Sequence, residues 1–255
     1  EGVLYSKDKT ILYRYPQGRK ETEYTIPSKV TEIGNKAFEN CYSLTNMVIP
    51  EGVLEIGSYA FSSCNNLTSI KIPSTVNKLE SDTFEYCDNL KNVEIAEGIK
   101  GINACAFYEC ISLENIKIPS SVTYIEYKAF GNCKELKTIE IPSSVLELDG
   151  AVFDGCSKLT DIKVNINNTK YCDDNGVVYT KNKTEIVIYP EAKKLTNYTI
   201  LSSVTSIGES AFSYSTNLRN IEIPEGVINI GEYAFRGCEN LQTIEIPEGI
   251  TSIND

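Results

Sequence analysis

Phenylalanine recurs along this sequence at a fixed interval of 23 residues. Six successive Phe residues keep this interval, from Phe38 to Phe153, and Phe212 and Phe235 repeat it. A fixed period of about 20 to 50 residues is the signature of repeat architectures, in which each unit packs only on its neighbours. The chain is therefore predicted to be a stack of equivalent coils and not a globule with one central core.

One unit of the repeat reads IPxxVxxIxxxAFxxCxxLxxIxI, and each part has a local meaning. The apolar residues Ala60, Phe61, Cys64 and Leu67 follow one another at steps of one, three and three, which predicts one face of a short helix. The residues that follow, up to Ile72, alternate between apolar and polar, which predicts a half-buried strand. Proline then ends the strand, because it lacks the N–H that a ladder of strands needs.

A second, longer repeat is superimposed on the first. Residues 175–255 align without gaps with residues 1–81, and 38 of these 81 positions are identical. Each copy begins with two β-rich runs around a polar turn, GVLYSKDKTILYRYP and GVVYTKNKTEIVIYP, which predicts a hairpin. We therefore expect a single solenoid with four parts: a hairpin and entry at 1–23, contiguous repeats at 24–164, a hairpin insert at 165–200, and further repeats to a truncated end at 201–255.

The unit IPSSVTYIEYKAFGNCKELKTIEIP at 118–142 resembles the BspA-like leucine-rich repeat, a 23-residue repeat found in surface proteins of host-associated bacteria and some parasitic protists. The resemblance covers nearly the whole chain, including both hairpins. It implies an α/β solenoid, a right-handed leucine-rich-repeat superhelix with a concave parallel β-sheet, short convex helices and inserted β-hairpins. It also implies adhesion to host proteins or to other cells, and no catalytic residues.

Composition narrows the range of functions. The chain carries 24 Lys and Arg against 35 Asp and Glu, a formal charge of −11, which disfavours nucleic acid and anionic membranes as partners. It contains no His and no Trp, so His-based triads and His metal sites are excluded. No run of about 18 apolar residues is present, so membrane insertion is not expected. We expect no catalytic residue, no cofactor and no metal site.

Seven of the nine cysteines lie three residues after a motif Phe. One interpretation is a row of metal ligands or of disulfides between coils, because neighbouring coils could place Cα atoms within the roughly 4.4 to 6.8 Å that a disulfide needs. The other is a small apolar residue that fills the core, which the odd total and the absence of CxxC pairs favour. Two cysteines lie outside the pattern, Cys105 and Cys172, and we expect the second to be the more exposed.

The outward side chains of the predicted sheet form the first candidate binding surface. One row of them alternates in the sign of its charge over the central coils, and a second row, two residues earlier in each strand, is polar. The alternative is that the Lys and Glu residues only hold an exposed sheet together and bind nothing. The candidate face comprises Asn46, Val48, Ser69, Lys71, Asn92, Glu94, Asn115, Lys117, Thr138 and Glu140.

Tyrosines crowd both hairpin regions and provide a second candidate surface. Tyr13, Arg14 and Tyr15 of the first hairpin are candidate contacts, because Tyr and Arg are enriched at the centres of protein interfaces. The alternative is that these rings pack the hairpin onto the adjacent coil.

These patterns predict a non-catalytic protein-binding or adhesion module of an extracellular or cell-surface protein, with a host matrix or cell-surface protein as its partner. A structural spacer without a ligand of its own is the alternative. A carboxylate-type glycan hydrolase comes third, because the acidic residues lie mostly at solvent-facing positions where nothing obvious raises a pKa. The chain begins and ends within its repeat and shows no leader or anchor, so we interpret it as a trimmed mature region or a fragment. The oligomeric state is not predicted.

Overall fold

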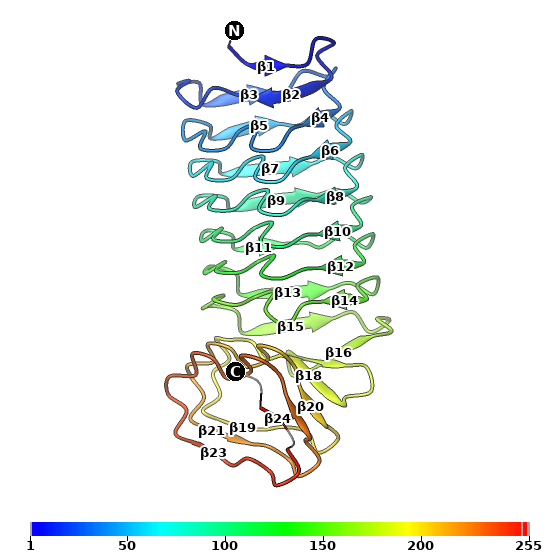
Figure 1. Ribbon diagram of the computed structural model, residues 1–255, viewed down its shortest axis with the longest axis vertical. Coiled ribbons are helices and arrows are strands. Elements are labelled where there is room, and N and C mark those ends of the chain that lie inside the picture. Colours follow the sequence, from blue (N-terminus) through cyan, green and yellow to red (C-terminus); the bar gives the residue numbers. More distant parts are fainter. Residues whose placement is uncertain (1, 251, 254–255) are drawn as a thin grey trace.

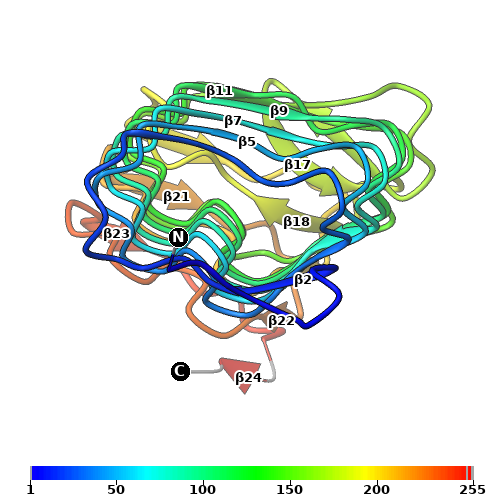
Figure 2. The same ribbon diagram turned by 90° about the horizontal axis from the view of Figure 1, so that it is seen from above.

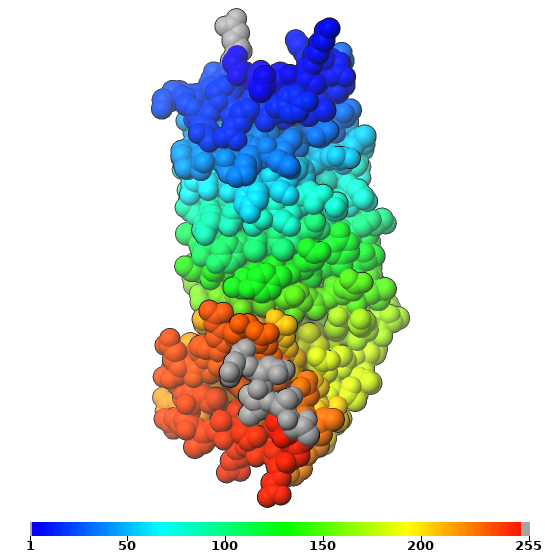
Figure 3. Space-filling model, viewed as in Figure 1, coloured from blue at the N-terminus to red at the C-terminus, as the bar shows by residue number. Residues whose placement is uncertain are grey.

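The computed structural model describes residues 2–250 and 252–253, which form a solenoid of stacked coils (Figure 1). We call residues 2–164 the first stack, residues 165–196 the insert, and the described residues from 197 on the second stack. Seen along their axis, the coils of the first stack superimpose (Figure 2). The second stack closes one end of the first and has a different axis (Figure 3). The two chain ends named in the expected division, residues 1 and 255, lie outside the described part.

One strand from each coil of the first stack belongs to a row that we call the ladder face. Buried and exposed side chains alternate along each strand, so that Val93 and Ile95 point into the core while Asn92 and Glu94 point outward. Neighbouring strands pair in parallel and align residues one repeat apart, such as Lys71 with Glu94. The strands of this row are β3 (Glu23–Thr25), β5 (Asn46–Val48), β7 (Ser69–Ile72), β9 (Asn92–Ile95), β11 (Asn115–Ile116), β13 (Thr138–Ile141) and β15 (Asp161–Val164).

A second row of very short parallel strands runs along another side of the first stack. It starts from an antiparallel hairpin, β1 (Leu4–Tyr5) and β2 (Ile11–Arg14). In β10 and β12 the aligned residues Ile102 and Ile125 are both buried, so this row closes the core opposite the ladder face. The remaining strands of the row are β4 (Glu32–Ile33), β6 (Glu55–Ile56), β8 (Lys78–Leu79), β10 (Gly101–Ile102), β12 (Tyr124–Ile125) and β14 (Glu147–Leu148).

The described residues contain no α-helix, so the prediction of an α/β solenoid with short convex helices is wrong. The stretch around Phe61 is a series of turns. The amide of Cys64 donates to the carbonyl of Phe61, three residues earlier, whereas the amides of Phe61 and Ser63 donate to Thr83 and Glu85 of the next coil. Alternate amides thus bond within the coil and between coils, which gives a β-solenoid of stacked parallel strands.

The spacing of the coils explains why turns replace helices. Parallel strands lie about 4.8 Å apart, whereas a helix with its side chains is about 10 Å wide. Helices on successive coils would have to spread apart and curve the stack, but these turns keep the spacing of the strands. Tyr59 and Ser63 have φ of 57° and 58°, and most coils repeat a left-handed residue at these two positions. The first stack is therefore nearly straight, and the ladder face is not the concave side of a horseshoe (Figure 1).

A column of aromatic rings fills the core. The rings from Phe38 to Phe153 stack in sequence, with neighbouring centroids 5.1 to 5.8 Å apart. Tyr15 and Tyr24 close the column at its beginning, since both rings contact Phe38. In the second copy, Tyr189 and Tyr198 contact Phe212 in the same way. Each copy of the long repeat therefore starts with a pair of tyrosines that covers the first Phe ring.

The insert is an antiparallel meander of β16 (Tyr171–Asp174), β17 (Val177–Thr180) and β18 (Glu185–Ile188). It is fixed to the last coil of the first stack, because the amide of Ile162 donates to the Gly176 carbonyl at 3.1 Å and the amide of Val164 to the Asp173 carboxylate at 2.8 Å. Strand β18 then pairs in parallel with the second stack. The second stack contains β19 (Asn197–Thr199), β20 (Ser206–Ile207), β21 (Asn220–Glu222), β22 (Asn229–Ile230), β23 (Thr243–Ile244) and β24 (Ser252–Ile253).

Candidate binding surfaces

Two lysines of the charged row form close ion pairs, Lys71 with Glu94 and, on β15, Lys163 with Asp161 at 3.2 Å. Lys71 Nζ lies 3.0 Å from Glu94 Oε1, and the two side chains are 59% and 68% exposed. The hydrogen bond to Glu94 raises the pKa of Lys71. Among the described residues, Lys117 and Glu140 form no ion pair on the same row, although their charges also alternate. The alternating signs therefore do not produce a continuous chain of ion pairs, and Glu140 instead accepts a long hydrogen bond of 3.5 Å from the Asn165 amide.

The ladder face is interrupted between β11 and β13, which belong to different sheets. A hollow of about 580 Å³ lies over this break and extends to β15. Four of the ten candidate residues line it, namely Asn115, Lys117, Thr138 and Glu140. The other six, Asn46, Val48, Ser69, Lys71, Asn92 and Glu94, lie on β5, β7 and β9 beside it.

The candidate residues of the first hairpin differ in their exposure. Tyr13 is 47% exposed. Arg14 is partly exposed, and its guanidinium donates to the Lys36 carbonyl and lies 3.6 Å from the Glu39 carboxylate. Tyr15, by contrast, is 2% exposed and stacks on Phe38, so its ring supports the core and does not face a partner.

The cysteine row lies inside the coils. All nine cysteines are free. In the motif position, the thiol of Cys87 is 3.2 Å from the Phe61 carbonyl, one coil earlier, and burial raises the pKa of this thiol well above its usual value. Cys172 is half-buried, and burial raises its pKa as well. Reactive cysteines have a lowered pKa, so these thiols fill space and are not activated nucleophiles.

Two carboxyl groups are buried where the insert meets both stacks. Asp154 accepts a hydrogen bond from the Ser213 hydroxyl of the second stack, and burial raises its pKa. Burial, together with the negative charge of Asp154, raises the pKa of Glu191 to about 7. The adjoining cavity of about 10 Å³ has room for about one water molecule and for no sugar. This carboxylate pair therefore gives no support to a glycan hydrolase.

A second groove, of about 700 Å³, lies between the insert and β19. None of the candidate residues from the sequence lines it, because it arises only where the insert folds against the end of the first stack. Comparison of the two aligned copies contains one sequence signal for this groove. The acidic Glu21 of the first copy is replaced in the second by Leu195, whose side chain is 42% exposed.

Because residues 2–250 and 252–253 include no helix, none of these surfaces belongs to a membrane-spanning helix.

A family model for the BspA type leucine rich repeat region matches six copies, at residues 15–105, 79–193 and 183–255. No curated protein matches the chain.

Several solved structures have a similar fold. A leucine-rich repeat protein from Eubacterium ventriosum is 27% identical, with a TM-score of 0.67 over 91% of this chain and 60% of that one. The pneumococcal vaccine antigen PcpA is 22% identical, with a TM-score of 0.66 over 94% and 55%. A leucine-rich cell surface protein from Faecalibacterium prausnitzii is 24% identical, with a TM-score of 0.57 over 90% and 68%. This chain therefore spans little more than half the length of the first two, and the last two show the fold alone.

Proposed function

The chain belongs to the BspA-type leucine-rich repeat family, and on that premise we propose that it is a non-catalytic module of a cell-surface protein that binds a protein partner through its ladder face. Membership of this family is what supports the proposed location. The proposed partner is a host matrix or cell-surface protein.

The observation that carries the proposal is the hollow over the break between β11 and β13. Lys117 and Glu140 border it from neighbouring coils, and neither is neutralised by an ion pair within the described residues. A protein surface that places an acidic group against Lys117 and a basic group against Glu140 pairs with both residues at once. Complementary charges of this kind increase specificity and the rate of association more than affinity.

The test is a binding screen of the purified chain against host matrix and cell-surface proteins, followed by reversal of both charges in Lys117→Glu/Glu140→Lys. We expect this double variant to weaken binding at least about tenfold, because each reversal places like charges together. A matched control, Lys29→Glu/Glu225→Lys, also preserves the net charge but changes exposed residues away from the ladder face. Unchanged binding in the first variant, or equal loss in the control, would contradict the proposal.

The straight first stack favours one alternative, a structural spacer that separates other parts of a surface protein. A spacer tolerates removal of one whole repeat, such as residues 69–91, since the coils on both sides can stack again in register. A protein-binding ladder face would lose part of its charged row by the same deletion. Absence of any binder in the screen, together with unimpaired folding after deletion of residues 115–137, which carry part of the hollow, would favour the spacer.

A further inference from the structure

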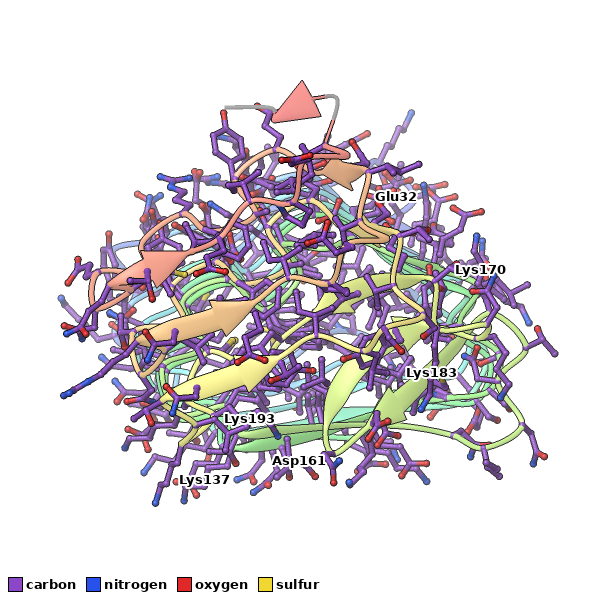
Figure 4. All side chains as sticks on the ribbon, turned by 90° about the horizontal axis from the view of Figure 1, so that it is seen from below. Glu32, Lys137, Asp161, Lys170, Lys183 and Lys193 are labelled. Carbon is purple, nitrogen blue, oxygen red and sulfur yellow. The ribbon has the colours of Figure 1, made fainter. Side chains whose placement is uncertain are left out.

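The groove between the insert and β19 combines a sheet edge with exposed apolar and cationic side chains. Its lining includes Thr160 of the first stack, Asp174, Tyr179, Lys193 and Leu195 of the insert, and Tyr198 of the second stack. The hydroxyls of Tyr179 and Tyr198 are 2.5 Å apart and fix the floor of the groove. Figure 4 shows Lys193 near Asp161, where the strands of the two stacks face each other.

Strand β19 uses only one of its two edges. It is the outer strand of the sheet β19-β21-β23, and its residues align in parallel with those of β21. Thr196 accepts from the amide of Asn220, and Ile200 donates to Glu222, so the even-numbered residues bond to β21. Because bonding alternates along a parallel strand, Asn197 and Thr199 direct their N–H and C=O groups to the other side. No other described strand pairs with that side.

The two cations beside this edge, Lys193 and Lys194, are not held in close ion pairs within the described residues. The Lys193 ammonium donates to the Asn175 carbonyl, and burial lowers its pKa more than the nearby Asp161 carboxylate raises it. The two acidic residues beside the groove, Asp161 and Asp174, form their ion pairs with Lys163 and Lys183 and not with Lys193 or Lys194.

The first copy of the long repeat has carboxylates at two positions where the second copy has neutral side chains. At the equivalent edge, β3, Arg19 pairs with Glu21 at 2.6 Å, and Glu23 lies on the strand itself. In the second copy these two acidic positions are Leu195 and Asn197. The second copy therefore keeps two adjacent cations and the free edge, but replaces the neutralising carboxylates with an apolar and an amide side chain.

We propose that this groove binds an extended acidic segment of a partner protein as an added strand on the free edge of β19. Its main chain pairs with Asn197 and Thr199, its carboxylates meet Lys193 and Lys194, and an apolar side chain covers Leu195. Strand addition of this kind draws affinity from main-chain hydrogen bonds and specificity from the side-chain pockets. The groove shares no lining residue with the hollow on the ladder face, so this proposal does not depend on the proposed function.

The first experiment measures fluorescence polarisation with a pool of labelled ten-residue peptides that carry Glu at alternate positions and random neutral residues between them. We expect binders with Kd near or below about 100 μM, and none in a matched pool with Lys in place of Glu, because strand addition here combines backbone and charge. Lys193→Glu/Lys194→Glu should weaken binding at least tenfold. Lys29→Glu/Lys91→Glu makes the same change in net charge at exposed sites away from the groove and should leave binding unchanged.

The second experiment tests the edge itself. Thr199→Pro removes the N–H that faces the groove while leaving the main-chain bonds to β21, and Thr25→Pro makes the same backbone change at the equivalent position of β3. Thr199→Val, which removes only the hydroxyl that donates to the Glu222 carboxylate at 2.8 Å, is the control for the loss of that side-chain bond. We expect only the first variant to lose peptide binding. Hydrogen exchange of the unmodified chain tests the same edge without a substitution. Added peptide should protect the amides of Asn197 and Thr199 from exchange, and it should leave the amides of Glu23 and Thr25 unprotected.

Several results would overturn the proposal. These are absence of any acidic binder below millimolar concentration, equal binding of the basic pool, binding that survives the Lys193 and Lys194 reversals, or protection of amides elsewhere. Sedimentation of the chain without peptide provides a further check: a dimer that dissociates in the Lys193→Glu/Lys194→Glu variant would make a second copy the occupant, and a peptide partner would then be wrong.

Discussion

The rings of Phe61 and Phe84 stack with an interplanar angle of 5° and centroids 5.1 Å apart, although one full repeat separates them in the sequence. Phe84 and Phe107 repeat this relationship at 5.4 Å and 5°. Each internal ring therefore has one ring on either side. The column is part of a continuous apolar core that runs through the first stack. The stability that each ring contributes should therefore depend on its position along the column.

Phe107→Ala should cost much more stability than Phe235→Ala. Phe107 is fully buried between two stacked rings, and its removal leaves a cavity, for which about 3 to 5 kcal/mol is typical. Phe235 is only half-buried and stacks on Phe212 alone among the described residues, so about 1 to 2 kcal/mol is expected. Urea unfolding of both variants measures the difference, and equal losses would show that the column is not a cooperative element.

The sequence predicted the repeat and the solenoid correctly, but the helices wrongly. The steps of one, three and three between Ala60, Phe61, Cys64 and Leu67 fit a helical face, yet successive turns with bonds across three residues give the same spacing. Periodicity alone therefore cannot separate the two. The deciding quantity is the distance between coils, which leaves no room for a helix in each, and this distance becomes visible only when the coils are stacked.

The six motif cysteines of the first stack should resist alkylation until the chain unfolds, because all of them are buried. Cys64, Cys87 and Cys133 are buried, and burial raises the pKa of each thiol well above its usual value. Iodoacetamide at pH near 8 should therefore label the half-buried Cys105, Cys172 and Cys238 first, since alkylation requires both access and thiolate. Peptide mass spectrometry with and without urea gives the order of labelling. Early labelling of Cys87 would contradict the packing described above.

Lys71 and Glu94 should contribute little to stability despite their close contact. Both side chains are more than half exposed, and pairs of this kind are typically worth less than about 1 kcal/mol. A double-mutant cycle with Lys71→Gln and Glu94→Gln should therefore give a coupling close to the error of the measurement, and any coupling should fade with added salt. A large coupling that persists in salt would instead favour the alternative in which the charges serve to hold the sheet together.

The candidate surfaces could be predicted from the sequence only in part. The alternation of apolar and polar residues along each predicted strand is enough to place Lys117 and Glu140 on the outer face of the sheet. The hollow beside them depends on the break between β11 and β13, which no residue pattern marks. In the hairpin, only the structure separates the exposed Tyr13 from the buried Tyr15. The groove at β19 depends on how the insert folds back on the first stack, a contact between segments that the repeat pattern treats as unrelated.

Glu191 should make the protein less stable as the pH rises from about 5 to 8. Its pKa is raised by burial from an ordinary 4.5 to about 7, so between these values the folded chain holds a proton that the unfolded chain releases. Stability from this group is therefore complete below about pH 4.5 and is lost as the pH rises through 7. Because the side chain is partly exposed to water, we expect a loss of only about 1 to 2 kcal/mol.

Glu191→Gln is the matching variant, since Gln17 occupies the equivalent position of the first copy. A neutral amide cannot ionise, so this variant should be more stable than the unmodified chain at pH 8 and should show a weaker pH dependence. Asp154, whose pKa burial also raises, should account for what remains, because its charge lies beside Glu191. Urea midpoints at pH 5 and 8 measure both effects, with the exposed Glu140→Gln as control. If Glu191→Gln kept the full pH dependence of the unmodified chain, the junction between the stacks would not contain the titrating group.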